Sequence, residues 1–356
     1  MNNELAKSGN SNLDTLGLFR TRNTRTQMKA KGNQLSGTGS EIEPEKTRRW
    51  AKRKTITLSL ILHLIDIAKR KDRSAKYIKS LWNTYHCLNN IKTSGNLLFA
   101  RYCKNRFCLN CAAIRKAELI NKYLPIVNTW PDPYFVTLTI KAIPAYSLKE
   151  YIKNGMVRGF KLLLDKLRKR HERGQGKKIM GIRALECNFN PIKQTYNPHY
   201  HIIVPDKETA DLLVKEWMLL WTDKHTIIYS QNTRPVKDTE KDLIEVIKYG
   251  TKIFTDPSMK KGRKKKTTHF VYISAMDNIL NAMAGIHQFE QFGFKVPKTT
   301  GYKTAPETSG KIEEWTYDIG QSDWANNEDD NQFLLDFELD EDIIEILVNN
   351  IDLVME

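Results

Sequence analysis

The feature that most constrains the fold is the order of strand-like and helix-like segments between residues 131 and 254. Runs of β-branched and aromatic residues bounded by Pro, Gly and Asn predict strands, and longer runs with apolar residues at helical spacing predict helices. The predicted strands cover residues 134–141, 180–189, 198–204 and 226–234, and the predicted helices cover 147–171, 206–221 and 238–254. A capping box, Ser147 followed by Glu150, is expected to begin the first helix. The order β-α-β-β-α-β-α predicts an α+β fold, with a central antiparallel sheet and helices on one face, of the ferredoxin-like split βαβ type.

Composition divides the rest of the chain around this region. Residues 1–54 are polar and lack an apolar period, which predicts a flexible basic arm. Residues 55–125 predict a small helical module that contains a cysteine cluster, and residues 126–300 are assigned to the α+β domain, with one more helix at 277–289. Residues 301–356 are predicted to form an acidic tail, in which FLLDFELDEDIIEILV is an amphipathic stretch expected to fold back on the basic body or to bind a partner.

The charge of the chain is divided unevenly. From residue 312 to the last residue there are fifteen acidic side chains and no Lys or Arg, so the rest carries all 57 basic residues against 26 acidic ones, a net charge of +31. A body this basic suits a polyanion, because neutralising phosphates releases their counterions. The charge therefore favours a protein that binds nucleic acid over a soluble basic protein without such a partner.

Export and membrane insertion are not expected. The most apolar helical stretch, TITLSLILHLIDIA at 55–68, is too short for a span and contains His63 and Asp66. The first residues lack an apolar secretory region. We therefore expect a cytoplasmic protein whose five cysteines are reduced.

Four of the five cysteines lie within one short stretch of the chain, CLNNIKTSGNLLFARYCKNRFCLNC. They are Cys87, Cys103, Cys108 and Cys111. The last two form a CxxC knuckle, and four thiolates suit tetrahedral zinc. Flanking Lys and Arg side chains favour the thiolate form. We predict a structural Zn²⁺ site, with His86 as a substitute ligand for Cys87, over the alternative of ordinary buried thiols. Cys187 lies within a predicted strand and is expected to pack in the core.

Two histidines in the segment PHYHIIV suggest a second metal site. On a strand His199 and His201 point to the same face, and Glu186 on the preceding strand is at an alternation that brings its carboxylate beside both imidazoles. Such a pattern also arises by chance on the wet face of a strand. Two histidines and one carboxylate with open positions suit a divalent ion that activates phosphate, and we predict Mg²⁺ or Mn²⁺ here.

The predicted helix after the sheet carries three further candidates in EVIKYGTK. Glu245, Tyr249 and Lys252 lie at i, i+4 and i+7, on one stripe. A glutamate beside a tyrosine can act as a base, and a lysine can hold a phosphate. Alone, the stripe is more typical of a surface helix than of a catalytic site. Its occurrence together with the histidine pair is what favours a catalytic role for these three residues.

Together these segments resemble a known family. FVTLTI, NPHYHIIV and EVIKYGTK are similar to the three ordered motifs of rolling-circle replication initiators of small bacterial plasmids, in the HUH endonuclease superfamily. CKNRFCLNCAAIRK resembles the cysteine-rich element that precedes them in the single-tyrosine branch, except that Leu109 stands where many relatives have proline. The resemblance covers residues 85–295. It implies that His199, His201 and Glu186 hold the catalytic ion. It also implies that Tyr249 forms a 5′-phosphotyrosine bond at a hairpin origin and frees a 3′-OH primer. Glu245 would then be the general base that helps water end the cycle, and Lys252 would orient the phosphate or the phenolate.

The same resemblance implies the partners, which are origin DNA and the host helicase and polymerase. The basic loop KKGRKKK is expected to contact DNA phosphates, its alternative being a solvated charge run; its cations are Lys260, Lys261, Arg263, Lys264, Lys265 and Lys266. Two other functions stay open: a transposase or relaxase of the same superfamily, and a non-catalytic DNA-binding regulator with a zinc knuckle. The spacing of Glu245 and Tyr249 and the upstream cysteines favour the initiator.

Overall fold

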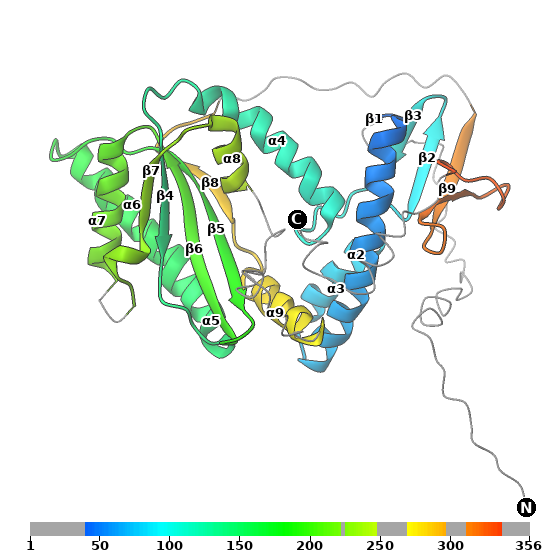
Figure 1. Cartoon of the computed structure of the whole chain (residues 1–356), viewed down its shortest axis with the longest axis horizontal. Coiled ribbons are helices and arrows are strands. Elements are labelled where there is room, and N and C mark those ends of the chain that lie inside the picture. Colours follow the sequence, from blue (N-terminus) through cyan, green and yellow to red (C-terminus); the bar gives the residue numbers. More distant parts are fainter. Residues whose placement is uncertain (1–39, 222–224, 248–268, 297–310, 337–356) are drawn as a thin grey trace, which may run out of the picture. The chain divides into compact units, whose positions relative to one another are not determined.

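The computed structural model describes residues 40–221, 225–247, 269–296 and 311–336, which form two compact units. Residues 40–55, 86–102 and 311–336 belong to the first unit, and the remaining described residues belong to the second (Figure 1). Across the described ranges, none of the helices has the length and apolarity needed to cross a membrane.

The first unit is built on a five-stranded antiparallel sheet of order β1-β3-β2-β9-β10. Its strands are β1 Ser40–Glu41, β2 Asn90–Ser94, β3 Leu97–Ala100, β9 Ile312–Asp318 and β10 Asp323–Asn326. Trp315, Tyr317 and Trp324 are buried here. The prediction of an acidic tail from residue 301 is therefore wrong for β9 and β10, because alternate apolar side chains of these strands fill a core. The stretch FLLDFELDEDIIEILV lies almost wholly outside the described residues.

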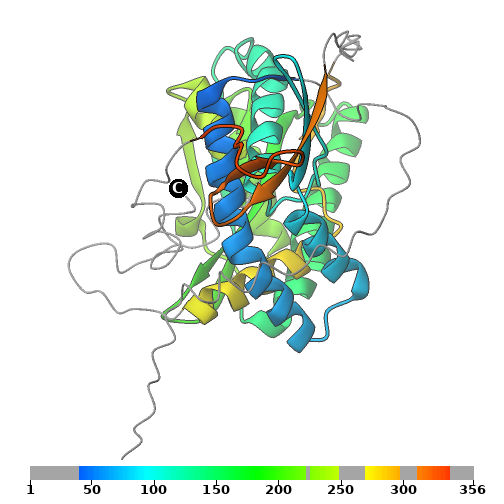
Figure 2. The same ribbon diagram turned by 90° about the vertical axis from the view of Figure 1, so that its right-hand side faces the viewer.

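The boundary of the predicted arm is also wrong, because helix α2 spans Pro44–Arg70 and begins ten residues inside it. A proline in the first helical turn lacks only an N–H that would have no partner there. Tyr317 of β9 donates its hydroxyl proton to the carbonyl of Ala51 at 3.0 Å and lies 2.5 Å from the Thr55 hydroxyl. These contacts hold the first turns of α2 along the sheet (Figure 2). Residues 1–39 lie outside the described residues.

The second unit contains a five-stranded antiparallel sheet of order β7-β4-β6-β5-β8. Its strands are β4 Tyr134–Thr139, β5 Gly181–Asn190, β6 Thr195–Val204, β7 Asn232–Pro235 and β8 Phe289–Phe292. The first four, in the order β7-β4-β6-β5, give the split βαβ arrangement that the sequence predicts, and the α+β class with an antiparallel sheet is confirmed. Strand β8 adds an edge strand that the sequence did not predict.

Helices cover both faces of this sheet (Figure 1). On one face Phe160 of α6 and Trp217 of α7 pack against Tyr200. On the other, α4 and α8 pack on Phe135, Ile182 and Ile203. The prediction of helices on one face thus holds for α6 and α7 only. Besides the end of α2, the α-helices described in the second unit are α3 Ala75–Tyr85, α4 Leu109–Val127, α5 Ala145–Glu150, α6 Arg158–Glu172, α7 Lys207–Leu220, α8 Thr239–Ile247 and α9 His269–Ala282.

The helical region after β4 differs from the prediction in its details. Helix α5 begins after Pro144 without a side-chain cap, and the Ser147 hydroxyl donates to the Pro144 carbonyl at 3.2 Å, so the predicted capping box is wrong. The extended backbone of Pro144 starts the helix instead. A π-helical segment, Tyr151–Val157, joins α5 to α6. The predicted helix at 277–289 is likewise shifted, because α9 ends at Ala282 and Phe289 already belongs to β8.

Helix α9 carries a fully buried carboxylate, Asp277. Its Oδ2 atom accepts hydrogen bonds from Lys71 at 3.1 Å and from Arg73 at 2.8 Å, and the side-chain oxygen of Asn278 accepts from the same two cations. This cluster ties α9 to the end of α2 within the second unit.

The change Asp277→Asn is expected to lower the free energy of unfolding by about 3–5 kcal/mol, because two half-buried cations lose their counter-charge. Urea denaturation followed by tryptophan fluorescence measures the loss. The control is Asp66→Asn, which breaks the exposed pair of Asp66 with Arg70 and should change stability by about 0.5 kcal/mol at most. Equal losses in the two variants would contradict the assignment.

Candidate metal centre and its surroundings

Strand register brings the two predicted histidines and the predicted carboxylate together. Glu186 of β5 lies directly opposite His199 of β6. On the other side of β6, Thr139 and Thr137 of β4 lie opposite His199 and His201. Because side chains alternate along a strand, the imidazoles share the sheet face on which α8 packs. Tyr200 points to the opposite face and is fully buried.

The three predicted ligand atoms converge. Nε2 of His199 and Nε2 of His201 lie 3.1 Å apart, and Oε2 of Glu186 lies 3.6 Å from the first and 3.5 Å from the second. Ligand atoms about 2.1 Å from one ion lie about 3.0 Å apart at adjacent octahedral corners and about 3.4 Å apart in a tetrahedron. The three atoms therefore have the spacing of one face of a divalent-ion site.

Neighbouring polar groups orient both imidazoles for this role. Nδ1 of His199 lies 3.0 Å from the backbone carbonyl of Asn197, which can only accept. Nδ1 therefore carries a proton that it donates to this carbonyl, and Nε2 is the ring nitrogen that faces the other two predicted ligands. Nδ1 of His201 lies 3.3 Å from the hydroxyl of Thr137, and the hydroxyl of Thr139 donates to the Asn197 side chain at 2.8 Å. Thr137 and Thr139 thus support the site as strand residues.

Glu186 is in a setting that favours a cation. Burial by itself raises the pKa of its carboxyl, but the adjacent imidazoles of His199 and His201 more than offset that effect and hold the pKa below its ordinary value. Its second oxygen, Oε1, is buried and has no hydrogen-bond partner among the described residues. A buried carboxylate oxygen without a donor is costly unless a positive charge compensates it.

Helix α8 places Glu245 on the same face of the sheet. Leu243, Val246 and Ile247 anchor the helix to β5 and β6. Arg234 of β7 binds Asp242 and lies 4.4 Å from the centre of the Phe135 ring, which itself contacts His201. The hydrogen bond to Asp242, together with the negative charges of Asp242 and Glu245, raises the pKa of Arg234. Glu245 is therefore near the arginine that borders the histidine pair.

Several predicted site residues lie outside the described residues. The helix predicted at 238–254 is described as far as Ile247, so Tyr249 and Lys252 lie beyond it. The predicted DNA-contacting loop also falls in the undescribed range 248–268; it comprises Lys260, Lys261, Arg263, Lys264, Lys265 and Lys266. Their roles stay predictions.

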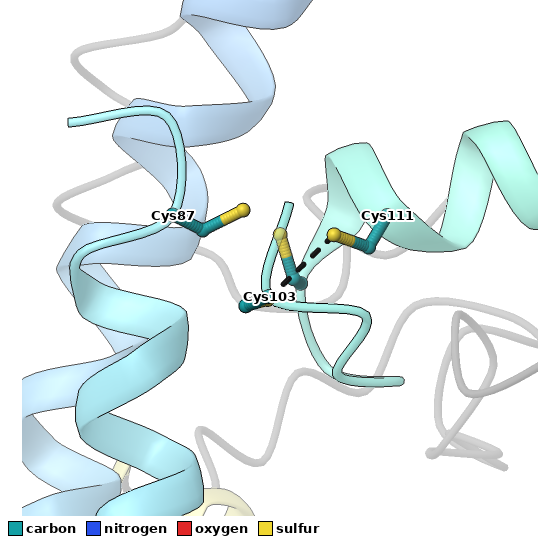
Figure 3. A group of neighbouring side chains, drawn as sticks. Cys87, Cys103 and Cys111 are labelled. Carbon is teal, nitrogen blue, oxygen red and sulfur yellow. Dashed lines mark hydrogen bonds between the residues drawn. The ribbon is translucent and has the colours of Figure 1, made fainter. Parts of the chain in front are cut away.

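Three of the four predicted zinc ligands form a group in the second unit. The sulfur atoms of Cys103, Cys108 and Cys111 all lie within 4.8 Å of one another, and none of these cysteines is in a disulfide. The sulfur atoms of Cys103 and Cys111, both drawn in Figure 3, lie 3.6 Å apart. Sulfur ligands of one tetrahedral zinc ion lie about 3.8 Å apart. These three cysteines thus have the spacing of zinc ligands, and Cys87, or His86 in its place, stays the predicted fourth ligand. Cys187 is buried in β5, as predicted.

Sequence reasoning missed the polar groups that support the histidines. Asn197 and Gln231 carry no metal-ligand signature, yet Asn197 orients His199, and Gln231 accepts from the backbone N–H of Thr139 at 2.9 Å. The contact to His199 comes from the backbone carbonyl of Asn197, which any residue at that position provides, so the residue type gives no signal.

Comparison with known proteins gives related sequences and no related structure. No family model and no solved structure matches the chain. A curated relative from Bacillus sp, named protein rep, is 28% identical over 42% of this chain and 50% of its own length. Another of the same name, from Bacillus amyloliquefaciens, is 24% identical over 51% of this chain and 60% of its own. The chain therefore spans only half to three fifths of these two relatives. A third, from Staphylococcus aureus, is 31% identical over 43% of this chain and 70% of its own length. That identity, maintained over more than two thirds of the relative, assigns the chain to the family of Rep proteins.

Proposed function

We propose that this protein initiates rolling-circle replication of a plasmid by nicking one DNA strand at the origin with a tyrosine nucleophile, as an HUH endonuclease. The observation that carries the proposal is the convergence of Glu186, His199 and His201 at 3.1–3.6 Å on a split βαβ sheet. The Rep names of the relatives and the basic charge of the chain support DNA as the substrate.

The three side chains would hold Mg²⁺ or Mn²⁺. When bound, such an ion supplies charge stabilisation at the scissile phosphodiester. What the chain itself contributes is orientation: Asn197 and Thr137 fix the two imidazoles, and the β5–β6 register presents the carboxylate beside them. A site supported in this way is organised before DNA binds.

The nucleophile in this proposal is Tyr249. Its phenolic oxygen attacks phosphorus, the bond from phosphorus to the 3′ oxygen breaks, and the leaving oxygen takes a proton to become a 3′-OH primer. The 5′ phosphate stays on the tyrosine. Glu245, one turn before the tyrosine in sequence, serves as a general base that activates water to end the cycle, and Lys252 holds the phosphate. Strand joining at termination reverses the first step.

Binding of the origin would be shared among basic segments. We assign phosphate contacts to Lys260–Lys266 and to the cysteine module, and we expect cleavage to need a single-stranded or hairpin substrate. A host helicase and a polymerase would then extend the 3′-OH.

The direct test is to incubate the protein with Mn²⁺ and labelled single-stranded hairpins that tile a candidate plasmid origin. We expect an SDS-resistant protein–DNA adduct that EDTA prevents, with the DNA attached to Tyr249 when the linked peptide is sequenced. Tight binding without any adduct across all hairpins would instead support a non-catalytic DNA-binding regulator.

The cysteine group leads to a separate prediction. We expect one zinc ion per chain in protein purified without chelators, because Cys103, Cys108 and Cys111 have the spacing of zinc ligands and a fourth ligand from Cys87 would complete a set that binds zinc strongly. Mass spectrometry of metal content measures it. Cys108→Ser should lose the zinc and part of the thermal stability, whereas the matched change Cys187→Ser, at the buried cysteine outside the group, should keep the zinc. Full zinc content in Cys108→Ser would contradict the assignment.

A further inference from the structure

A short turn before β7 exposes three consecutive large apolar side chains. Ile227, Ile228 and Tyr229 are 53%, 51% and 94% exposed. We call these three residues the apolar tip. Single exposed apolar residues are common, but a consecutive run in a tight turn is unfavourable unless it has a function.

The apolar tip is held rigidly. Thr226, just before it, is buried and donates its hydroxyl proton to the Thr139 carbonyl at 2.9 Å. Gln231, just after it, donates to the Ile227 carbonyl at 3.0 Å and to the Thr226 hydroxyl at 2.7 Å. The turn itself, Ile228–Ser230, is a single 3₁₀ turn closed by a backbone bond from Ser230 to Ile227 at 3.2 Å. A partner therefore meets a preformed surface and loses little affinity to ordering it.

Register places the apolar tip beside the candidate metal centre. Asn232, three residues after Tyr229, pairs with Thr137, and Thr137 pairs with His201 on its other side. Two strand spacings separate Asn232 from His201, which is about 10 Å. Gln231 also binds both backbone groups of Thr139, the residue opposite His199. A few nucleotides of single-stranded DNA could therefore span the distance from the apolar tip to the place where a scissile phosphate would bind.

The charges around the apolar tip indicate a polyanion as its partner. Residues 225–237, HTIIYSQNTRPVK, contain no carboxylate, and their cations are Lys237 and Arg234, the second of which pairs with Asp242 of α8. The exposed Lys141 is attached to the same turn, because its backbone N–H donates to the His225 carbonyl at 2.6 Å. An exposed aromatic ring with cations at its border is the combination that binds single-stranded nucleic acid, because rings stack on bases and cations hold the backbone.

We propose that the apolar tip is a stacking platform for unpaired nucleobases that flank the scissile phosphate, with Tyr229 as the principal contact and Lys141 as a phosphate contact. The proposal deepens the proposed function and rests on it for the position of the phosphate. It assigns to the turn a substrate-positioning role that is separate from the metal ligands and from the nucleophile.

The test measures affinity for a fluorescein-labelled oligothymidylate by fluorescence anisotropy, without added Mg²⁺ or Mn²⁺, with the full chain. Tyr229→Ser should weaken binding about 5- to 150-fold, the range for loss of one base–aromatic stack. Tyr229→Phe keeps the ring and should bind like wild type. The control is Leu219→Ser, which removes another exposed apolar side chain, from α7, and should have no effect.

Salt dependence separates stacking from charge. Tyr229→Ser should leave the slope of log affinity against log salt unchanged, whereas Lys141→Ala should reduce that slope by about one. Wild-type affinity in Tyr229→Ser, or an equal loss in Leu219→Ser, would overturn the proposal. Because the assay contains no added Mg²⁺ or Mn²⁺ and no cleavage step, its result is independent of adduct formation. If the wild type forms the adduct but Tyr229→Ser binds the oligothymidylate with unchanged affinity, this inference alone is refuted. If Tyr229→Ser weakens binding but the wild type forms no adduct, the nicking function alone is refuted.

Discussion

Replacing His199 by alanine is expected to reduce Mn²⁺-dependent adduct formation by about 100- to 1,000-fold, because loss of several kcal/mol of charge stabilisation at the phosphate slows the step by that factor. His199 is the most strongly supported of the three predicted ligands, since its Nδ1 is committed to the Asn197 carbonyl and its Nε2 points at both partners. The variant should also lose Mn²⁺ affinity in isothermal titration, which separates an ion-binding role from a purely structural one.

Two companion variants sharpen this prediction. Glu186→Gln keeps the shape of the side chain but removes its charge, and it should also weaken Mn²⁺ binding. His287→Ala changes an exposed histidine in the link between α9 and β8 and should leave both affinity and adduct formation unchanged. Unaltered manganese dependence in His199→Ala, with the fold intact by circular dichroism, would refute the metal centre.

Replacing Tyr249 by phenylalanine is expected to abolish the adduct, with a loss of at least about 1,000-fold, because phenylalanine has no oxygen to attack phosphorus. DNA binding should persist, since phosphate contacts and the proposed stacking surface do not involve this hydroxyl. Gel analysis under denaturing conditions measures the adduct, and anisotropy measures the binding.

The matched control for Tyr249→Phe is Tyr200→Phe. Tyr200 stands between the two histidines, but it is fully buried on the opposite face of the sheet, and burial raises the pKa of its hydroxyl to about 12. A phenylalanine there should retain full activity. Normal adduct formation by Tyr249→Phe would show that another residue is the nucleophile.

The central sheet was predictable because its signals are local. Alternation in β4 and β6 and helical spacing in α6 and α7 are read within each segment, and the order of these segments selects the split βαβ arrangement. Boundaries that depend on long-range contacts were not predictable. Strand β9 pairs with β2, more than 200 residues earlier, and Tyr317 binds Ala51 of α2. The acidic charge after residue 301 predicted a tail where β9 and β10 lie, and the polar composition of residues 1–54 predicted an arm where α2 begins.

The candidate site divides in the same way. Two histidines at alternate positions must share a face of any strand that contains them, and CxxC spacing brings two sulfur atoms together in any fold. The pairing of Glu186 with His199 requires the β5–β6 register, which the sequence predicted only as one possible alternation. The contact of Thr137 with His201 follows from the β4–β6 pairing, and the contact of His199 is with the backbone carbonyl of Asn197, so no residue type in the sequence signals either one.

By itself, the sequence determined the α+β class, the antiparallel sheet and the residue types available for metal binding, because each depends on periodicity or on spacing within one segment. Only the tertiary structure decided which carboxylate completes the histidine pair, which groups orient the imidazoles, and where the apolar tip lies. The physical reason is that these are distances between strands, and strand register is set by packing over the whole sheet rather than by any one stretch of the chain.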